Sequence, residues 1–446
     1  MNNIIVSKFG GSSLADSTQF GKVKKIIQSD KRRKYIVPSA PGKRFGTDYK
    51  ITDLLYLCHG HAEQGIPFDD VYKVISNRYM DLAKDLEIIQ KLDIETYLIA
   101  IKEKIASGAS SDYTASRGEF LNGLILSAYL DYEFIDATEL IYFNRSGNLD
   151  TEKTQGVIHE RLSRTEKAVI PGFYGSLPNG NIKTFSRGGS DITGAIIARG
   201  AYADLYENWT DVSGFLMADP KIVNNPKHID KITYRELREL SYMGATVLHE
   251  DSIFPVKRSG IPIHIKNTNR PQDEGTVILS DFEALNNTGT ITGIAGRKDF
   301  TVIAIEKTLV NAELGFGRKL LSILESNGVS LENMPSGIDA ISLVIADTQL
   351  ENKLDNIIDE IEKQCNPDSI EVYPNMALVA TVGRGMMKTK GIAAKIFHAL
   401  EQKNVNIRMI NQGSSEINII IGVETDDFEK AVIAIYEAFE NPVEAK

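Results

Sequence analysis

Cysteine is scarce in this sequence, long apolar runs are absent, and basic residues do not dominate. Only two of the 446 residues are cysteines, Cys58 and Cys365, which excludes a disulfide framework and a CxxC metal site. The longest apolar stretches, such as 417–423, are far too short to span a membrane. The N-terminal MNNIIVSKFGG lacks the basic and apolar regions of a signal peptide, so we expect a cytoplasmic protein without membrane contacts.

The charge balance is acidic. A formal net charge of −10 argues against sequence-independent binding of nucleic acid, which requires a basic surface. The composition, with 42% hydrophobic and 25% charged residues, is that of a globular protein. A chain of this length exceeds one ordinary core, so we expect two or three domains.

The first part of the chain alternates between expected strands and helices. A strand is predicted at 4–9, a helix at 17–29, and a long helical region at 51–130, where apolar residues recur every three or four positions. Strands and helices alternate again over 134–209. This order predicts a mostly parallel sheet with helices on both faces, forming a catalytic domain over residues 1–284.

The pattern changes near residue 285. A polar, turn-rich stretch at 285–300 is predicted to be a linker. Two similar units follow, at 301–376 and 377–446, each expected as strand, helix, strand, strand, helix. The order repeats after about 75 residues, which indicates an internal duplication. SNGVSLENMPSGIDAISLVI and QKNVNIRMINQGSSEINIII occupy equivalent places in two such ferredoxin-like sandwiches of helices on one sheet.

The first strand leads into a phosphate-binding pattern, KFGGSS at 8–13. Glycines let backbone N–H groups approach phosphate oxygens, consecutive amides form an anion-binding nest, and Lys8 adds a full positive charge. The chain has no GxxxxGK[ST], so this is not a Walker A loop. The alternative interpretation is a surface lysine beside a tight turn.

A second loop, SRGGSD at 186–191, repeats this arrangement before an apolar helix. Arg187 is suited to gripping a carboxylate through two hydrogen bonds. Asp191 is either part of a site or simply the N-cap of the helix. Two glycine pairs with charged neighbours in one domain favour a site for two anionic substrates.

Other polar residues are less distinctive. WTDVSG at 209–214 follows a strand and is succeeded by ADPK at 218–221, and ligands of open α/β sheets bind beyond such strand ends. An ordinary β-turn explains the same residues equally well. Glu119, within SRGE at 116–119, and Thr52, which follows a polar loop that we expect to be mobile, do not stand out by spacing alone.

Together, SKFGGSS, SRGE, FSRGGSD and WTDVSGF followed by ADPK resemble the motifs of the aspartokinases. The resemblance covers the whole chain, because that family also ends in two tandem ACT-type regulatory units, and QGSSEINI at 412–419 is similar to the signature of the second. It implies transfer of the γ-phosphate of ATP, carried with Mg²⁺, to the β-carboxylate of L-aspartate, the first step toward lysine, threonine and methionine. The attacking carboxylate is already ionised, so positioning and charge neutralisation replace a general base.

The resemblance also implies roles for single residues. Glu119 is expected to hold the ammonium group of aspartate, and Arg187 its α-carboxylate. The residues implied in catalysis are Lys8, Gly10, Gly11 and Asp191. Those implied at aspartate are Ser39, Thr52, Glu119, Arg187 and Ser190. Those implied at the nucleotide are Lys8, Gly11, Ser12, Thr210, Asp211, Phe215, Asp219 and Lys221.

One position departs from the family pattern. Some members carry a lysine that contacts nucleotide where this chain has Thr246, in GATVL at 244–248. Threonine cannot supply that charge, so Thr246 is left out of the predicted site.

The C-terminal units are implied to bind an inhibitory amino acid, lysine in preference to threonine, and to form a homodimer, or a tetramer. Glu332 and Asp339 are suited to an ammonium group, although solvated loop acids are an equally good interpretation. The implied effector contacts are Gly315, Phe316, Glu332, Asn333, Met334, Ser336 and Asp339.

Two other functions stay open on the sequence alone. One is an enzyme of the same fold that acts on glutamate, acetylglutamate, carbamate or a nucleotide. The tandem units argue against it, as do Glu119 and Arg187, which together suit the two charges of an amino acid. The other is an amino-acid sensor that has lost catalysis, although it would have no use for Lys8, Arg187 and Asp191.

Overall fold

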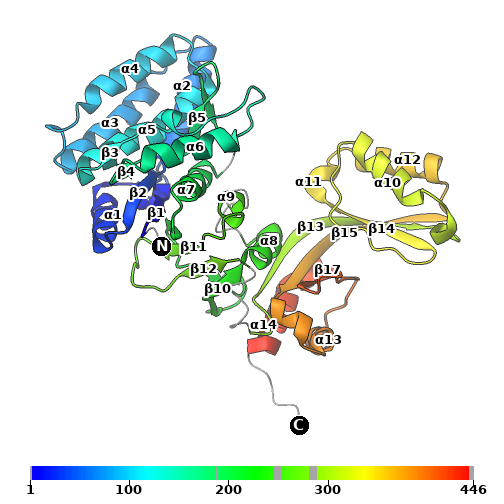
Figure 1. Ribbon diagram of the computed structural model, residues 1–446. Coiled ribbons are helices and arrows are strands. Elements are labelled where there is room, and N and C mark those ends of the chain that lie inside the picture. Colours follow the sequence, from blue (N-terminus) through cyan, green and yellow to red (C-terminus); the bar gives the residue numbers. More distant parts are fainter. Residues whose placement is uncertain (1–2, 187, 246–252, 281–288, 441–446) are drawn as a thin grey trace. The chain divides into compact units, whose positions relative to one another are not determined.

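The computed structural model describes residues 3–186, 188–245, 253–280 and 289–440 (Figure 1). These residues divide into two compact units, which we describe separately. The first holds 3–215, 229–234 and 253–280, and the second holds 216–228, 235–245 and 289–440. Within the described ranges, no helix has the length and apolar character needed to cross a membrane.

The first unit is built on an eight-stranded sheet. Its strands are β1 (Ile5–Phe9), β2 (Arg33–Pro38), β3 (Glu133–Phe134), β4 (Ala168–Val169), β7 (Leu205–Thr210), β10 (Lys231–Thr233), β11 (Ile263–Asn267) and β12 (Thr276–Leu279). Their order is β10-β12-β11-β7-β1-β2-β4-β3, and only the β11–β12 pair is antiparallel. A hairpin of β5 (Tyr174–Ser176) and β6 (Ile182–Thr184) stands apart, and β8 (Phe215–Leu216) pairs with β9 (His228–Ile229).

Helices cover this sheet on both faces, as the sequence predicts. They are α1 (Ser17–Ser29), α2 (Ile51–Glu63), α3 (Asp69–Asp85), α4 (Ile94–Ala106), α5 (Ser111–Leu130), α6 (Thr151–Leu162), α7 (Gly189–Gly200) and α9 (Ile253–Lys257). Side chains cap several N-termini; the Asp16 carboxylate, for example, accepts the Gln19 N–H at the start of α1.

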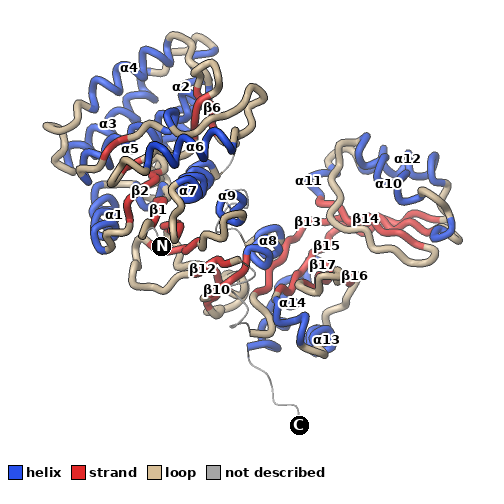
Figure 2. The backbone as a smooth tube through the Cα atoms, viewed as in Figure 1, coloured by secondary structure: helices blue, strands red, loops and turns tan. Residues whose placement is uncertain are grey.

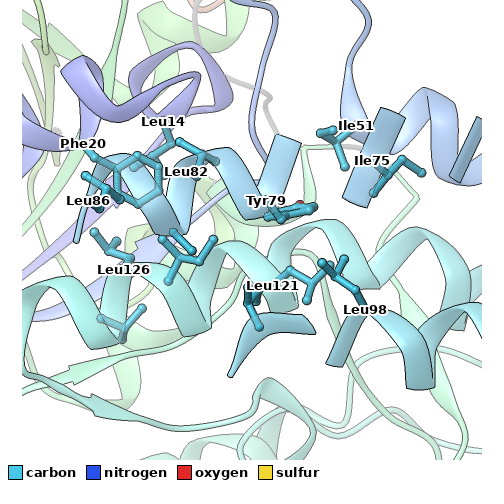
Figure 3. Close-up of a cluster of buried hydrophobic side chains, with 14 of the residues drawn as sticks. Leu14, Phe20, Ile51, Ile75, Tyr79, Leu82, Leu86, Leu98, Leu121 and Leu126 are labelled. Atoms are coloured by element: carbon cyan, nitrogen blue, oxygen red, sulfur yellow. The ribbon is translucent and has the colours of Figure 1, made fainter. Parts of the chain in front are cut away.

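The main core lies on one face of the sheet. Apolar residues of α1 to α5, such as Phe20 and Tyr79, pack together there (Figure 3). Phe9, Ile36 and Trp209 from the strands belong to the same core. Helix α7 packs against β1, β2 and β7 from the opposite face, where the Tyr206 ring lies against Gly194. Alternate residues of β1 and β7 therefore face either the apolar core or α7.

The second unit is one antiparallel sheet of five strands (Figure 2). Its strands are β13 (Gly293–Glu306), β14 (Ala340–Ala346), β15 (Ser369–Val382), β16 (Met409–Asn411) and β17 (Asn418–Glu424), in the order β14-β13-β15-β17-β16. Its helices are α8 (Tyr234–Tyr242, from Arg235), α10 (Phe316–Ser326), α11 (Asp347–Leu350), α12 (Leu354–Cys365), α13 (Ile392–Gln402) and α14 (Phe428–Glu440).

The two repeats share their longest strands. One end of β13 pairs with the end of β15, at Gly293 and Val382, and the other end pairs with the start of β15, at Glu306 and Ser369. Strand β13 therefore begins inside the stretch expected as a linker, 285–300, which corrects that expectation for residues 293–300. Charged residues at 297–299 interrupt the apolar alternation and hide this strand in the sequence.

Two further features differ from expectation. In the first repeat, the sequence order predicts a second strand directly after the first helix, at 329–334. The structure shows isolated bridges there and just beyond, from Asn333 to Val344 and from Ser336 to Ile341. Helix α8 lies within the range assigned to the catalytic domain but packs in the second unit. There the buried Glu236 carboxylate accepts from the Thr292 hydroxyl at 2.6 Å and the Arg384 N–H at 3.0 Å.

Candidate active site

The register of two neighbouring strands places the first pair of polar residues. Strands β1 and β7 are parallel, and Lys8 is the register partner of Asn208. Both side chains are on the face that α7 covers, since their neighbours Phe9 and Trp209 belong to the opposite core. The first turn of α7 brings Asp191 to the same place.

Lys8, Asp191 and Asn208 form a compact cluster, in which Lys8 and Asn208 are buried and Asp191 is partly buried. The Lys8 Nζ lies 2.6 Å from Asp191 Oδ1, and the two side chains are 9% and 17% exposed. Asn208 contacts both partners: its Nδ2 donates to Asp191 Oδ1 at 3.0 Å, and its Oδ1 accepts from Lys8 Nζ at 3.4 Å. The Tyr206 hydroxyl donates to the Asp191 carbonyl at 3.0 Å and fixes the backbone of this turn.

The alternative role of Asp191 as an N-cap is excluded. The N-cap of α7 is Gly188, with a φ of 57°, and Asp191 is the third residue of the helix. Ser190, which precedes it, is buried against Gly172, where a Cβ would lie 2.7 Å from the serine side chain. Sequence analysis therefore predicted the neighbourhood of Asp191, but its side chain contacts Lys8 and Asn208 instead of capping the helix.

The glycine loop after β1 contacts a second loop backbone to backbone. The Gly10 N–H donates to the Trp209 carbonyl at 2.9 Å, and the Gly42 N–H donates to the Gly11 carbonyl at 2.8 Å. A Cβ on Gly42 would lie 2.6 Å from the Gly11 carbonyl carbon, so only glycine fits this approach. Ser12 continues the turn as part of a short 3-10 helix, Gly11–Leu14.

The polar loop at 41–50, which we expected to be mobile, is held by the buried guanidinium of Arg78. Its Nη2 donates to the carbonyls of Gly42 at 2.6 Å and Ala15 at 2.9 Å, and its Nη1 donates to Asp48 at 2.8 Å. The guanidinium groups of Arg44 and Arg78 hold the pKa of the Asp48 carboxyl well below its usual range. These contacts tie the 41–50 loop to both ends of the glycine loop.

Glu119 lies on α5 with its carboxyl almost wholly buried. Burial raises its pKa to about 8, although a hydrogen bond from the Ala40 N–H opposes the rise. Its Oε2 has no hydrogen-bond partner among the described residues. One turn later, Asn122 Nδ2 donates to the Ser39 carbonyl at 2.6 Å, so α5 positions the start of the 41–50 loop. Thr52 is the second residue of α2, after that loop.

The residues expected at the nucleotide are only partly together. Thr210 and Asp211 follow β7 and are tied to the end of β11, where the Thr268 N–H donates to the Thr210 carbonyl and Asn267 Nδ2 to the Asp211 carbonyl. Phe215 is buried, with its N–H bonded to Thr276. The exposed Asp219 and Lys221 belong to the second unit.

Two positions singled out in the sequence, Arg187 and Thr246, lie outside the described residues. Across the described ranges, no three His, Cys, Asp or Glu side chains gather as a metal site.

Sequence reasoning missed the amides Asn122, Asn208 and Asn267. Each side chain bonds to residues that are distant in the sequence, either to two side chains at once or to a backbone carbonyl. Asparagine is also too common in loops to stand out in a sequence. The one available signal was Asn208 itself, a polar residue directly before WTDVSG in a strand whose four central residues are all buried.

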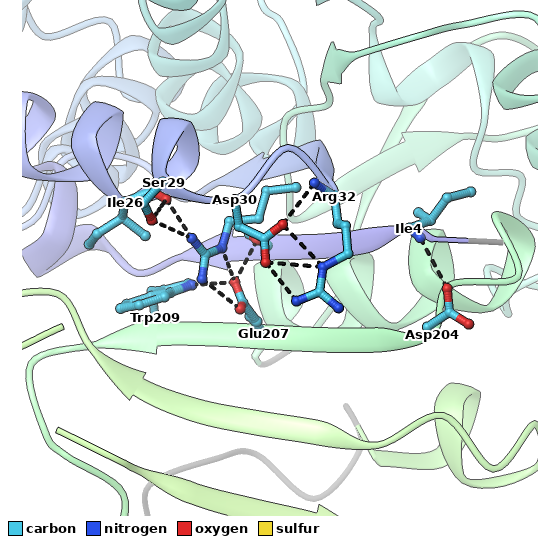
Figure 4. Close-up of polar contacts among 10 residues, drawn as sticks. Ile4, Ile26, Ser29, Asp30, Arg32, Asp204, Glu207 and Trp209 are labelled. Atoms are coloured by element: carbon cyan, nitrogen blue, oxygen red, sulfur yellow. Dashed lines mark hydrogen bonds and ion pairs between the residues drawn. The ribbon is translucent and has the colours of Figure 1, made fainter. Parts of the chain in front are cut away.

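A second cluster occupies the other face of the same strands (Figure 4). Ser7 and Glu207 are register partners, and Arg33 binds the Glu207 carboxylate through two bonds, Nε to Oε2 at 2.7 Å and Nη2 to Oε1 at 2.9 Å. The Ser7 hydroxyl and the Trp209 Nε1–H donate to Oε2 as well, at 2.9 and 2.8 Å. Sequence analysis did not predict this cluster.

Comparison with known proteins identifies the family. The amino acid kinase family matches residues 3–267, and an ACT domain matches residues 379–439. Aspartokinase 3 of Bacillus subtilis is 40% identical over 451 residues, which cover 97% of this chain and 98% of that protein. The chain belongs to the aspartokinase family.

Solved aspartokinases share the whole fold. The crystal structure of Clostridium acetobutylicum aspartate kinase is 67% identical, with a TM-score of 0.91 over 98% of this chain and 99% of that one. E. coli aspartokinase III, 26% identical, matches in its complex with aspartate and ADP (TM-score 0.73, 98% and 99% covered) and in its complex with lysine and aspartate (TM-score 0.75, 98% and 100%). The predicted family, fold class and enzyme class are confirmed.

The expected effector residues of this aspartokinase lie at the start of α10 and in the loop before β14, both in the second unit. Gly315, with a φ of 81°, is the N-cap of α10, and the buried Phe316 is its first residue. Met334 lies near that turn, within 3.9 Å of the Cβ position of Gly317. Ser336 is exposed and bridges to Ile341.

The two acids in these loops have structural partners. Glu332 Oε2 accepts from the Tyr242 hydroxyl of α8 at 2.5 Å, and its Oε1 lies 3.6 Å from Arg297 Nη1. Asp339 Oδ1 accepts the Leu309 N–H at 2.7 Å. Glu332 is therefore not simply solvated. Asn333 accepts from Asn411 Nδ2, so equivalent segments of the two repeats touch.

Proposed function

We propose that this aspartokinase transfers the γ-phosphate of ATP to the β-carboxylate of L-aspartate. The products are 4-phospho-L-aspartate and ADP, and the reaction is the first step toward lysine, threonine and methionine. The observation that carries the proposal is the buried Lys8–Asp191 pair beside the Gly10-Gly11 turn. It supports phosphoryl transfer because it holds a cation, backbone N–H groups and glycines at one strand end.

Lys8 has three ammonium protons and two protein partners. A phosphoryl oxygen offers a stronger acceptor than the Asn208 amide, 3.4 Å away, so ATP draws the Lys8 ammonium toward the transferred group. The N–H groups of Gly11 and Ser12, at the start of a helical turn, add donors on the same side. Mg²⁺, held by the ATP phosphates, supplies the remaining charge neutralisation when it is bound.

Glu119 is proposed to bind the ammonium group of aspartate. A buried carboxyl with an unpaired oxygen and a pKa of about 8 is costly by itself and gains a partner when a cation arrives. Ser39 after β2, Thr52 in the first turn of α2 and Ser190 in the first turn of α7 are proposed, by resemblance, to contact aspartate. Arg187 is proposed, by resemblance, to hold the α-carboxylate. The β-carboxylate, ionised near neutral pH, attacks without a general base.

The second unit is proposed to bind an inhibitory amino acid, lysine in preference to threonine. The support is that E. coli aspartokinase III was crystallised with lysine and aspartate. The Glu332 loop offers a carboxylate already in a hydrogen-bond network. We further propose a homodimer formed through the ACT-type units, or a tetramer, and a cytoplasmic location.

An assay that couples ADP release to NADH oxidation tests the reaction. We expect turnover with ATP, Mg²⁺ and L-aspartate, and none with glutamate. Turnover with glutamate alone would refute the substrate assignment. Repeating the assay with lysine, threonine and both, with the mass measured in each condition, tests the effector and the oligomer.

A further inference from the structure

We propose that Asn208 is a positioning residue that holds Asp191 in place while Lys8 moves to the phosphoryl group. The inference rests on the proposed roles of Lys8 and Asp191 and adds a residue that the motifs do not contain. It is carried by one observation: a single amide contacts both members of the buried ion pair.

The backbone of Asn208 is rigidly placed. Strand β7 pairs with β1 on one side and β11 on the other, so Asn208 lies between Lys8 and Ile265 in the middle of the sheet. The residue is only 3% exposed. Because this backbone is held on both sides, the Asn208 amide keeps its place when the Lys8 side chain moves.

The chemistry of the amide suits two opposite charges. Its oxygen accepts from the Lys8 ammonium, and its nitrogen donates to the Asp191 carboxylate. A carboxylate at this position would compete with phosphate for Lys8, and a cation would compete with Lys8 for Asp191. Asparagine is a short side chain that offers a donor and an acceptor on two separate atoms without adding charge.

The distances indicate which contact gives way. Lys8 is held at 2.6 Å by Asp191 but only at 3.4 Å by Asn208, whereas Asn208 holds Asp191 at 3.0 Å. When Lys8 turns to a phosphoryl oxygen, Asp191 keeps its bond to Asn208 Nδ2. Without that bond, the carboxylate is free to rotate with the ammonium group and to repel the incoming phosphate.

The first test is Asn208→Leu, which preserves the size but removes both hydrogen bonds. We expect kcat to fall about tenfold, because only the bond to Asp191 persists when Lys8 turns to the phosphoryl group, and its loss is the loss of one hydrogen bond. KM for aspartate should stay within about twofold. Asn179→Leu, at an exposed asparagine in the turn between β5 and β6, is the matched control and should leave kcat unchanged. An unchanged kcat in Asn208→Leu, with only lower stability, would overturn the inference.

The second test is Asn208→Asp, followed across pH. At pH 8 the added carboxylate retains Lys8 and repels Asp191, so kcat should fall further than in Asn208→Leu. Two adjacent carboxylates share a proton, and a protonated aspartic acid has the donor and acceptor of an amide. Activity relative to the unchanged enzyme should therefore recover as the pH falls, and Asn208→Leu should show no recovery.

Among the described residues, the charged groups that contact Asn208 are Lys8 from β1 and Asp191 from α7, and the Tyr206 hydroxyl donates to the Asp191 carbonyl. A pH profile of Asn208→Asp parallel to that of the unchanged enzyme would contradict a positioning role. This comparison does not use Asn208→Leu, so it holds even if that variant does not fold. If Lys8→Ala keeps its kcat, the proposed function is refuted. If Lys8→Ala loses activity but the Asn208 variants keep the kcat of the unchanged enzyme, only the role of Asn208 is refuted.

Discussion

Strands β1 and β7 carry a buried charge cluster on each face, and the two clusters differ in how completely they are satisfied. On one face, the Glu207 carboxylate receives two bonds from Arg33 and one each from Ser7 and Trp209. On the other, Lys8 shares three protons between one strong and one weak acceptor. A saturated cluster stabilises the fold, whereas one with a donor to spare is ready for a ligand.

Removing Arg33 tests the structural side of this comparison and should have the largest effect. Arg33→Met leaves the Glu207 carboxylate, only 4% exposed, without its cation, which typically costs about 3–5 kcal/mol of unfolding free energy. Urea unfolding measures the change. Arg32→Met is the matched control, because Arg32 forms an exposed pair with Asp30 and should change stability by less than about 1 kcal/mol. Equal effects of the two variants would contradict the contrast between the clusters.

Removing Lys8 tests the other face. Lys8→Ala should lower kcat by about 100- to 1000-fold, because a donor to the transferred phosphoryl group is lost, while the protein stays folded. Steady-state kinetics and circular dichroism measure the two quantities. A Lys8→Ala variant that loses as much stability as Arg33→Met but retains its kcat would show that Lys8 stabilises the fold and does not act in catalysis.

Glu119→Gln tests a second group with an unsatisfied hydrogen-bonding atom, the buried carboxylate proposed to bind aspartate. Since the Glu119 carboxyl has a pKa of about 8 before aspartate binds, kcat/KM for aspartate should rise with pH up to about 8 in the unchanged enzyme. The glutamine variant should lose this dependence, and its KM at pH 8 should rise by about tenfold or more, the loss of one charged hydrogen bond. An unchanged KM would remove Glu119 from the aspartate site.

The same substitution has an opposite effect on stability. A carboxyl whose pKa is raised by folding stabilises the protein fully below its unfolded value of 4.5, and this contribution is lost as the pH rises to about 8. Glu119→Gln removes that loss. The variant should therefore be more stable than the unchanged enzyme at pH 8 to 9, with the advantage disappearing near pH 4.5; thermal unfolding across this range measures it.

The smallest expected effect concerns regulation. Glu332→Gln should raise the lysine concentration for half-inhibition by about tenfold, the loss of one charged hydrogen bond, with kcat unchanged. Glu362→Gln, at an exposed position of α12, is the control. Inhibition that is unaltered in Glu332→Gln would leave this carboxylate only its contacts with Tyr242 and Arg297.

The sequence predicted those features that are local or that belong to short motifs. The parallel sheet, the duplicated C-terminal units and the juxtaposition of Lys8 with Asp191 all follow from such signals. Asn208 could not be predicted, because its importance arises from a register between strands 200 residues apart. The packing of α8 in the second unit was equally hidden, since a helical period shows which face is buried but not what covers it.

Strands β13 and β15 have a consequence for how this chain can be divided. Each strand runs through both repeats, and the ladder between them extends from the Gly293–Val382 pair to the Glu306–Ser369 pair, with shifts in register near Phe300. A cut at residue 376 falls within β15, and a fragment ending there would leave residues 293–297 with an open edge, prone to pair with other chains. The two halves of the duplication therefore form one structural unit. Removing either half, by deletion or by proteolysis, leaves unpaired strand backbone in the other.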